Sequence, residues 1–117
     1  MNPLWTDLAA RAAVPLSPDQ HALLSRYLDL LLEANQSMNL TRITDRAAAE
    51  VQHVGDALTL LPHLPPGDIL LADVGSGGGV PGIPLAVARP DARVLLIEST
   101  KKKANFLRSA AAKLGLP

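Results

Sequence analysis

The segment Asp73-Val-Gly-Ser-Gly-Gly-Gly-Val-Pro-Gly82 decides the expected fold. Residues 69–74 lead into it as a short apolar run, which is typical of a strand buried on both faces. Residues 83–89 follow it with the composition of a helix that Pro90 ends. A strand, a glycine-rich loop and a helix in this order predict a site where backbone N–H groups can approach a ligand closely.

The same order repeats once. Residues 93–98 read as a second buried strand, and residues 101–114 read as a second helix with Gly115 at its C-terminal cap. A strand–helix–strand–helix series predicts an α/β fold in which these elements open a doubly wound, Rossmann-like sheet.

Residues 1–62 have a helical pattern instead. Asn2-Pro3 can start a short helix that Pro15 ends, and Ser17-Pro-Asp-Gln20 has the composition of a capping box. Behind it, apolar side chains recur at helical spacing: Leu23, Leu24, Tyr27, Leu28, Leu31, Ala34 and Met38. The expected later helices are one capped by Thr44 or Asp45 and running to Val54, and a further piece over 56–61. We therefore divide the chain into a helical segment, 1–62, and an α/β domain, 63–117.

Composition excludes several classes of protein. The chain has 117 residues, 11 basic and 11 acidic side chains and no Cys, so a disulfide scaffold, a thiolate zinc site and a Cys nucleophile are excluded. Aromatic residues are only 3%, which disfavours a base-stacking platform. The apolar runs are far shorter than the roughly 18–20 residues of a membrane span. We expect a soluble cytoplasmic protein with no membrane partner.

Two acids sharpen the interpretation of the loop. Glu98 ends the second strand, where a carboxylate can accept both hydroxyls of an adenosine ribose. Asp73 directly precedes the loop, where it would repel a pyrophosphate and favour a ligand with a cationic group. Although Gly77-x-Gly79-x-x-Gly82 matches a dinucleotide fingerprint, Asp73 favours S-adenosylmethionine over NAD. An NAD-type oxidoreductase remains an alternative.

The loop and its flanking residues resemble those of the RsmG (GidB) family of ribosomal RNA methyltransferases. The loop and its continuation Gly82-Ile-Pro-Leu85 carry the resemblance, and Met38-Asn-Leu-Thr41, His53-Val-Gly-Asp56 and Glu98-Ser-Thr-Lys-Lys-Lys103 extend it. Met38 stands where the family usually has an aromatic residue, and Ala57 stands where Ser is common.

The resemblance implies methylation of ring nitrogen 7 of a guanine in 16S ribosomal RNA, with S-adenosylmethionine as the cofactor. The implied partner is 16S ribosomal RNA or the small ribosomal subunit. Carried over by position, the implied cofactor contacts are Gly75, Val80 and Glu98-Ser99-Thr100. Asp73 and Gly77 are further candidates because of their places before and within the loop.

Ring nitrogen 7 carries a lone pair and no proton, so its methylation needs no general base. We therefore assign no catalytic residue. We also expect no metal, because His53 and Asp56 lack Glu or Cys companions. The other class of function is a non-catalytic remnant or an RNA-binding module, against which the zero net charge counts.

The remaining polar residues have weaker interpretations. His53 and Asp56 share a helix face, either as a structural hydrogen-bonded pair or near the cofactor end of the sheet. His21 and His63 are expected at the surface. The candidates for contact with RNA phosphate are Lys101, Lys102, Lys103, Arg42, Arg46 and Arg89.

A complete doubly wound sheet has about six strands, and this sequence predicts only two of them. We therefore expect exposed strand edges and a cofactor cleft open on one side. The expected consequences for the 117-residue chain are aggregation, weak binding of S-adenosylmethionine and no methyl transfer to ribosomal RNA.

Overall fold

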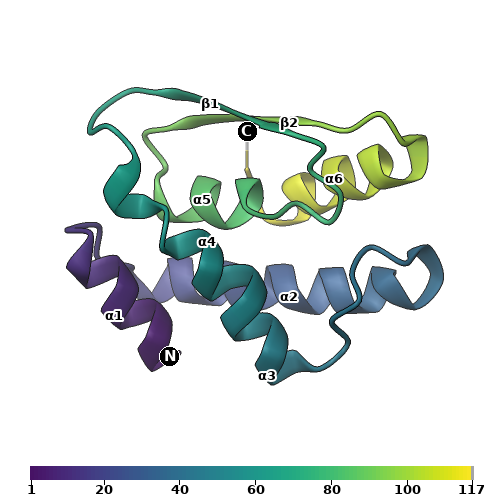
Figure 1. Ribbon diagram of the computed structural model, residues 1–117, viewed down its shortest axis with the longest axis horizontal. Coiled ribbons are helices and arrows are strands. Elements are labelled where there is room, and N and C mark those ends of the chain that lie inside the picture. The colour runs from purple at the N-terminus through teal and green to yellow at the C-terminus, as the bar shows by residue number, and fades with distance from the viewer. Residues whose placement is uncertain (117) are drawn as a thin grey trace.

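The computed structural model describes residues 1–116 and shows a mixed α/β arrangement in layers (Figure 1). A sheet of two strands, β1 (Leu70–Val74) and β2 (Arg93–Ile97), forms one layer. Helices α5 (Gly82–Ala88) and α6 (Lys101–Lys113) lie beneath it, and the helices of the N-terminal half form the layer below (Figure 1). The expected α/β character is confirmed.

The two strands are parallel and in register from Leu70 opposite Arg93 to Val74 opposite Ile97. Helix α5 makes the connection between them, as parallel pairing requires a crossover. Each strand is one residue shorter than expected, because Ile69 and Glu98 fall outside the paired residues.

Local capping determines where the first two helices begin. In α1 (Pro3–Arg11) the side chain of Asn2 accepts hydrogen bonds from the N–H groups of Leu4 and Trp5. In α2 (Pro18–Met38) the capping box is confirmed, because Ser17 Oγ accepts from Gln20 N at 3.1 Å and Gln20 Oε1 accepts from Ser17 N at 2.7 Å. Helix α2 ends at a left-handed Asn39, with φ of +51°.

The third helical stretch differs from the expected pair of separate helices. Asp45 caps α3 (Arg46–Ala49), which continues through a π-helical turn, η1 (Glu50–Gly55), into α4 (Asp56–Leu58) and then a 3₁₀ turn, η2 (Leu61–His63). The expected break before Asp56 was therefore wrong. The indole N–H of Trp5 donates to the carbonyl of Glu50 at 2.9 Å, and a side chain that bonds into the helical ladder favours a wider turn.

One hydrophobic core joins the helical half to the sheet half. Its buried members include Leu24 and Leu28 of α2, Ile83 and Leu85 of α5, and Leu107 of α6. Such a shared core explains why α2 packs against both α5 and α6.

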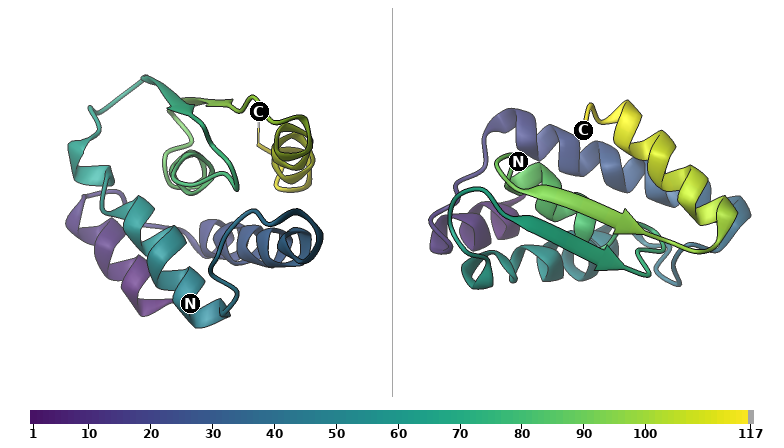
Figure 2. Two further views of the ribbon diagram at one scale, coloured as in Figure 1. Left: turned by 45° about the vertical axis from the view of Figure 1, so that its right-hand side comes forward. Right: turned by 90° about the horizontal axis from the view of Figure 1, so that it is seen from above.

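The sheet is covered on one face only, although the apolar runs are typical of strands buried on both faces. All helices of residues 1–116 lie on the same side of the sheet (Figure 2). Leu71 and Leu96 pack against the core, whereas Leu70 and Val74 are 69% and 75% exposed. Leu95 and Ile97 are likewise exposed on that bare face. The apolar runs therefore correspond to one half-buried row and one uncovered row of side chains.

His21 is buried, which contradicts its expected surface position, whereas His63 is exposed as expected. The ring of His21 stacks on Trp5 with 6.1 Å between centroids, and its Nε2 lies 3.2 Å from Thr6 Oγ1. Burial lowers the pKa of His21.

Within the described residues, no helix is both long enough and apolar enough to cross a membrane.

Arg89 has a structural role that excludes its expected contact with RNA phosphate. Its side chain is 7% exposed and pairs with Asp91, with Nε 2.8 Å from Oδ1. It also donates to the carbonyls of Pro65 and Gly67 at 3.1 and 2.9 Å, and so ties the segment before β1 to the turn before β2.

Replacing Arg89 with Met should therefore lower the free energy of unfolding by about 1.5–3 kcal/mol, the usual contribution of hydrogen bonds to a charged group. The matched control is Arg93→Met, which removes an exposed cation nearby and should change stability by no more than about 0.5 kcal/mol. Urea unfolding measures both, and equal midpoints would contradict the structural role of Arg89.

Candidate functional site

The glycine-rich loop begins at the carboxyl ends of both strands. The N–H groups of Gly75 and Ser76 both donate to the carbonyl of Ile97, at 2.7 and 3.1 Å, and the N–H of Gly79 turns back to Ser76 O at 2.7 Å. Gly75 and Gly77 have φ of +74° and +54°, a left-handed backbone conformation that residues other than glycine rarely adopt. The loop conformation therefore depends on glycine at these positions.

Glu98 closes this loop from the second strand. One carboxylate oxygen accepts the N–H of Gly77 at 2.8 Å, and the other accepts the N–H of Thr100 at 2.9 Å. The bonds from Thr100 and then Gly77 hold the pKa of Glu98 below its ordinary value. Glu98 is therefore an ionised acceptor at neutral pH, and each of its oxygens keeps a further lone pair.

Asp73 lies on the other side of the loop and contacts the start of α5. Its Oδ2 accepts the N–H of Gly82 at 3.1 Å. Burial raises the pKa of this half-buried carboxyl, and hydrogen bonds from Gly82 and Ser76 oppose the shift. A Cβ on Gly82 would lie 2.8 Å from Oδ2 of Asp73 and would overlap Cδ2 of Leu96, so glycine permits this close approach of helix and sheet.

Tyr27 of α2 connects the helical half to the glycine-rich loop. The hydroxyl of Tyr27 donates to the carbonyl of Gly78 at 2.6 Å, and a Cβ on Gly78 would lie 2.9 Å from Leu31 Cδ1. Burial, and to a smaller extent the charge of Asp73, raises the pKa of Tyr27, so its hydroxyl stays a donor.

Sequence reasoning placed Tyr27 only among the apolar residues of α2 and missed this contact. The available signal was a single Tyr on an otherwise aliphatic helix face, because a buried Tyr hydroxyl usually has a hydrogen-bond partner.

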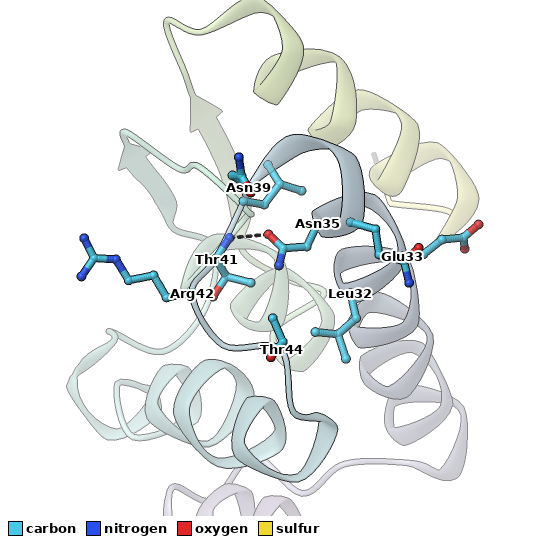
Figure 3. Close-up of a pocket in the computed structure, with 9 residues that line it drawn as sticks. Leu32, Glu33, Asn35, Asn39, Thr41, Arg42 and Thr44 are labelled. Atoms are coloured by element: carbon cyan, nitrogen blue, oxygen red, sulfur yellow. Dashed lines mark hydrogen bonds between the residues drawn. The ribbon is translucent and has the colours of Figure 1, made fainter.

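A second polar segment lies beside the loop. After the left-handed Asn39, the side-chain oxygen of the buried Asn35 accepts the N–H of Thr41 at 2.8 Å (Figure 3). Leu40 lies against the loop, with its Cβ 3.7 Å from the position of a Cβ on Gly78. The hydroxyl of Thr41 is 2.8 Å from Nε2 of His53, so residues 38–41 and the π-helical turn are joined directly.

A hollow of about 1050 Å³ opens between this segment and the end of α2. Its lining is rich in amide, hydroxyl and charged groups and consists of Leu32, Glu33, Asn35, Gln36, Asn39, Leu40, Thr41, Arg42 and Thr44. The guanidinium of Arg42 extends away from the hollow (Figure 3). The hollow offers both donors and acceptors next to the loop.

The structure brings most of the predicted cofactor residues to one edge of the sheet. Asp73, Gly75, Gly77, Glu98 and the backbone of Thr100 surround the loop through the contacts described above. Two further predicted residues differ: Val80 is half-buried against the core, and Ser99 is exposed. Their roles toward a cofactor remain predictions.

Other candidates are engaged elsewhere. His53 hydrogen bonds to Thr41, and Asp56 is exposed and acts on His53 only through its charge. Burial lowers the pKa of His53, and Asp56 partly opposes the shift. Arg46 is bound by Asp29, Glu50 and Ser25, so it is occupied within the protein. Among residues 1–116, no group of three or more His, Cys, Asp or Glu could hold a metal ion.

The fold and the site define a class: mixed α/β proteins whose candidate ligand site is a glycine-rich loop at the carboxyl edge of a parallel sheet, flanked by an acid within the end of β1 and an acid directly after β2. Comparison with protein families narrows this class. The family described as rRNA small subunit methyltransferase G (GidB) matches residues 20–117, and the chain belongs to this family.

Curated relatives agree with the family match. A protein of Chromobacterium violaceum is 50% identical over 108 residues, which cover 92% of this chain and 51% of the relative. A protein of Sorangium cellulosum is 52% identical over 114 residues, which cover 96% of this chain and 48% of the relative. Both are named ribosomal RNA small subunit methyltransferase G. The chain thus spans about half the length of these relatives.

Proposed function

We propose that this chain forms the cofactor-binding part of an S-adenosylmethionine-dependent methyltransferase that methylates ring nitrogen 7 of a guanine in 16S ribosomal RNA. The observation that carries the proposal is the ionised Glu98 carboxylate held against the loop at the carboxyl edge of the sheet. Membership in the methyltransferase family and the names of the relatives support the reaction and the substrate class.

The residues present fit S-adenosylmethionine. A Cβ built on Gly75 would meet nothing within 4 Å, so the backbone there is open to a ligand. Glu98 has acceptor lone pairs left for the two hydroxyls of a ribose. Asp73 adds a carboxyl group beside the loop, which suits a sulfonium and opposes a pyrophosphate.

In this proposal each predicted residue has one task. Glu98 accepts the ribose hydroxyls, and Ser99 and Thr100 continue this contact along the chain. Gly75, Gly77 and Val80 line the side of the loop that faces the ligand, and Asp73 balances the cationic charge. When bound, S-adenosylmethionine supplies an activated methyl group on sulfur with a neutral leaving group.

The target atom explains why we assign no catalytic residue. Ring nitrogen 7 of guanine offers a lone pair without a proton to remove, so the protein's task is to orient the two partners and exclude water. The proposed partner is 16S ribosomal RNA or the small ribosomal subunit, which places the enzyme in the cytoplasm.

We further infer that β1 and β2 begin a doubly wound, Rossmann-like sheet, because ligands of such sheets bind outside the carboxyl ends of the strands, where Glu98 and the loop lie. The division into a helical segment, 1–62, and an α/β domain, 63–117, is likewise a proposal. Because α2, α5 and α6 share one hydrophobic core, we propose that the helical segment and the α/β domain fold together as one unit.

Titration with S-adenosylmethionine in a calorimeter tests the proposed function. The unaltered chain should bind it, and Glu98→Ala should weaken binding at least about tenfold, since hydrogen bonds to a charged group contribute roughly 1.5–3 kcal/mol. The control Asp68→Ala removes an exposed carboxylate before β1 and should leave the affinity unchanged.

Two outcomes would contradict the proposal. If Glu98→Ala binds S-adenosylmethionine as the unaltered chain does, Glu98 is not the ribose acceptor. If the unaltered chain binds NAD but not S-adenosylmethionine, the chain is the oxidoreductase-type alternative. Binding of neither ligand, together with RNA binding, would indicate the non-catalytic RNA-binding alternative.

A further inference from the structure

The zero net charge of the chain hides a strong separation of charge. Helix α6 carries five of the 11 basic residues and no acid: Lys101, Lys102, Lys103, Arg108 and Lys113. The rest of the chain holds the other six basic residues and all 11 acids. Helix α6 is therefore positively charged, whereas the rest of the protein is negatively charged. Basic residues clustered along one helix are a typical feature of surfaces that bind nucleic acid.

The cations of α6 point to solvent rather than into the protein. Lys101, Lys102, Arg108 and Lys113 are exposed, and we call these four residues the α6 basic face. The ion pairs within residues 1–116 all involve Arg11, Arg46 or Arg89, so none of them includes a residue of the α6 basic face.

The position of the three lysines that begin α6 does not serve the helix itself. Lysines in the first turn oppose the positive end of the helix dipole, and the side chain of Thr100 makes no capping hydrogen bond. The opposite side of α6 buries Phe106, Leu107 and Ala110 in the core. The basic charge at the start of α6 is therefore placed there at a local cost in stability, which points to a partner.

The α6 basic face begins next to the candidate cofactor site. Helix α6 starts three residues after Glu98, whose carboxylate also binds the N–H of Thr100, the residue before the helix. Hydrogen bonds from Thr100 and Gly77 are the main causes that lower the pKa of Glu98, and the charge of Lys103 adds to them. From Lys101 to Lys113 the helix extends about 18 Å at 1.5 Å per residue, and it lies at the margin of the molecule (Figure 2).

We propose that the α6 basic face is the surface on which this protein holds the phosphate backbone of its RNA substrate, beside the methyl-transfer site. The inference rests on the proposed function for the choice of RNA. A lipid surface fits less well, because the apolar side of α6 is already buried and cannot insert into a bilayer. An extended row of exposed cations suits a chain of phosphates, which binds by releasing counterions.

The salt dependence of RNA binding tests this assignment. The variant Lys101→Gln/Lys102→Gln/Arg108→Gln removes three charges and leaves Lys103, the neighbour of Glu98, in place. The matched control Arg11→Gln/Arg26→Gln/Arg93→Gln removes three exposed cations from α1, α2 and β2. Binding of each protein to 16S ribosomal RNA is measured by fluorescence anisotropy between 50 and 200 mM salt, with circular dichroism as the check on folding.

We expect the α6 variant to bind RNA at least about tenfold more weakly and to have a smaller slope of log K against log salt, by about 2, since each lost phosphate contact lowers the slope by roughly 0.7–0.9. The control should keep both the affinity and the slope. Equal losses in both variants, no loss in the α6 variant, or no RNA binding by the unaltered chain at 50 mM salt would each overturn the proposal.

Two further measurements distinguish RNA binding by the α6 basic face from lipid binding and from the proposed methyltransferase function. Loss of binding to phosphatidylglycerol vesicles by the α6 variant, with unchanged RNA binding, would identify a lipid surface and overturn the RNA assignment. Calorimetry with S-adenosylmethionine should give the same affinity for the α6 variant as for the unaltered chain. If the α6 variant loses RNA binding while no protein binds S-adenosylmethionine, the basic face stands and the proposed methyltransferase function fails.

Discussion

Replacing Gly79 with Ala should lower the free energy of unfolding by about 3 kcal/mol or more. Gly79 has φ of +96°, which costs an L-residue roughly 1–3 kcal/mol in strain. Its Cβ would also lie 2.6 Å from Ile83 Cδ1 and 3.2 Å from Leu107 Cδ2, and overpacking of this kind costs a further 1–3 kcal/mol or so. The total is a large part of the roughly 5–15 kcal/mol that stabilises a domain.

Gly115→Ala is the matched control for Gly79→Ala. Gly115 also has a positive φ, +69°, but a Cβ there meets nothing within 4 Å. The control therefore carries backbone strain without overlap and should cost about 1 kcal/mol. Urea unfolding followed by circular dichroism measures both variants. If the two lose equal stability, the contact of the loop with α5 and α6 is looser than the structure shows.

Replacing Gly77 with Val should reduce affinity for S-adenosylmethionine at least about a hundredfold while α1 and α2 remain folded. Gly77 lies in the left-handed region, at φ of +54°, where a β-branched residue is a genuine outlier. The loop would have to change conformation, and the N–H of Gly77 would then leave the carboxylate of Glu98.

The control for the Gly77 variant is Gly67→Val. Gly67 has φ of +82°, a Cβ there meets nothing within 4 Å, and it lies in the segment before β1, away from the loop. This variant should lose some stability from strain but keep its cofactor affinity. Calorimetry measures the affinity, and circular dichroism reports the helices. Normal binding by Gly77→Val would mean that the loop is only a turn.

The features that sequence predicted correctly depend on neighbours along the chain. The capping box of Ser17 and Gln20 involves residues three apart, and the glycine loop follows its strand directly. Glu98 was predicted at the end of the second strand, and the order of elements alone implies that parallel strands bring their carboxyl ends to one edge.

The features that sequence missed depend on residues far apart in the chain. Tyr27 is 51 positions from Gly78, whose carbonyl it binds. Trp5 is 45 positions from Glu50, where the π-helical turn starts. A pattern of apolar spacing identifies which face of a helix is buried, but it cannot identify which backbone carbonyl a buried donor will meet.

The amino-acid sequence by itself determined the order of elements, the family and the chemistry available at the loop, because each of these depends on residue type and local spacing. Only the tertiary structure decided which of the charged residues are free to act. Arg46 and Arg89 have the same side chain as exposed arginines, yet Arg46 is half-buried, Arg89 is buried, and both are paired with carboxylates. The cations of α6 remain exposed because its apolar face is packed into the core, which directs the opposite face to solvent.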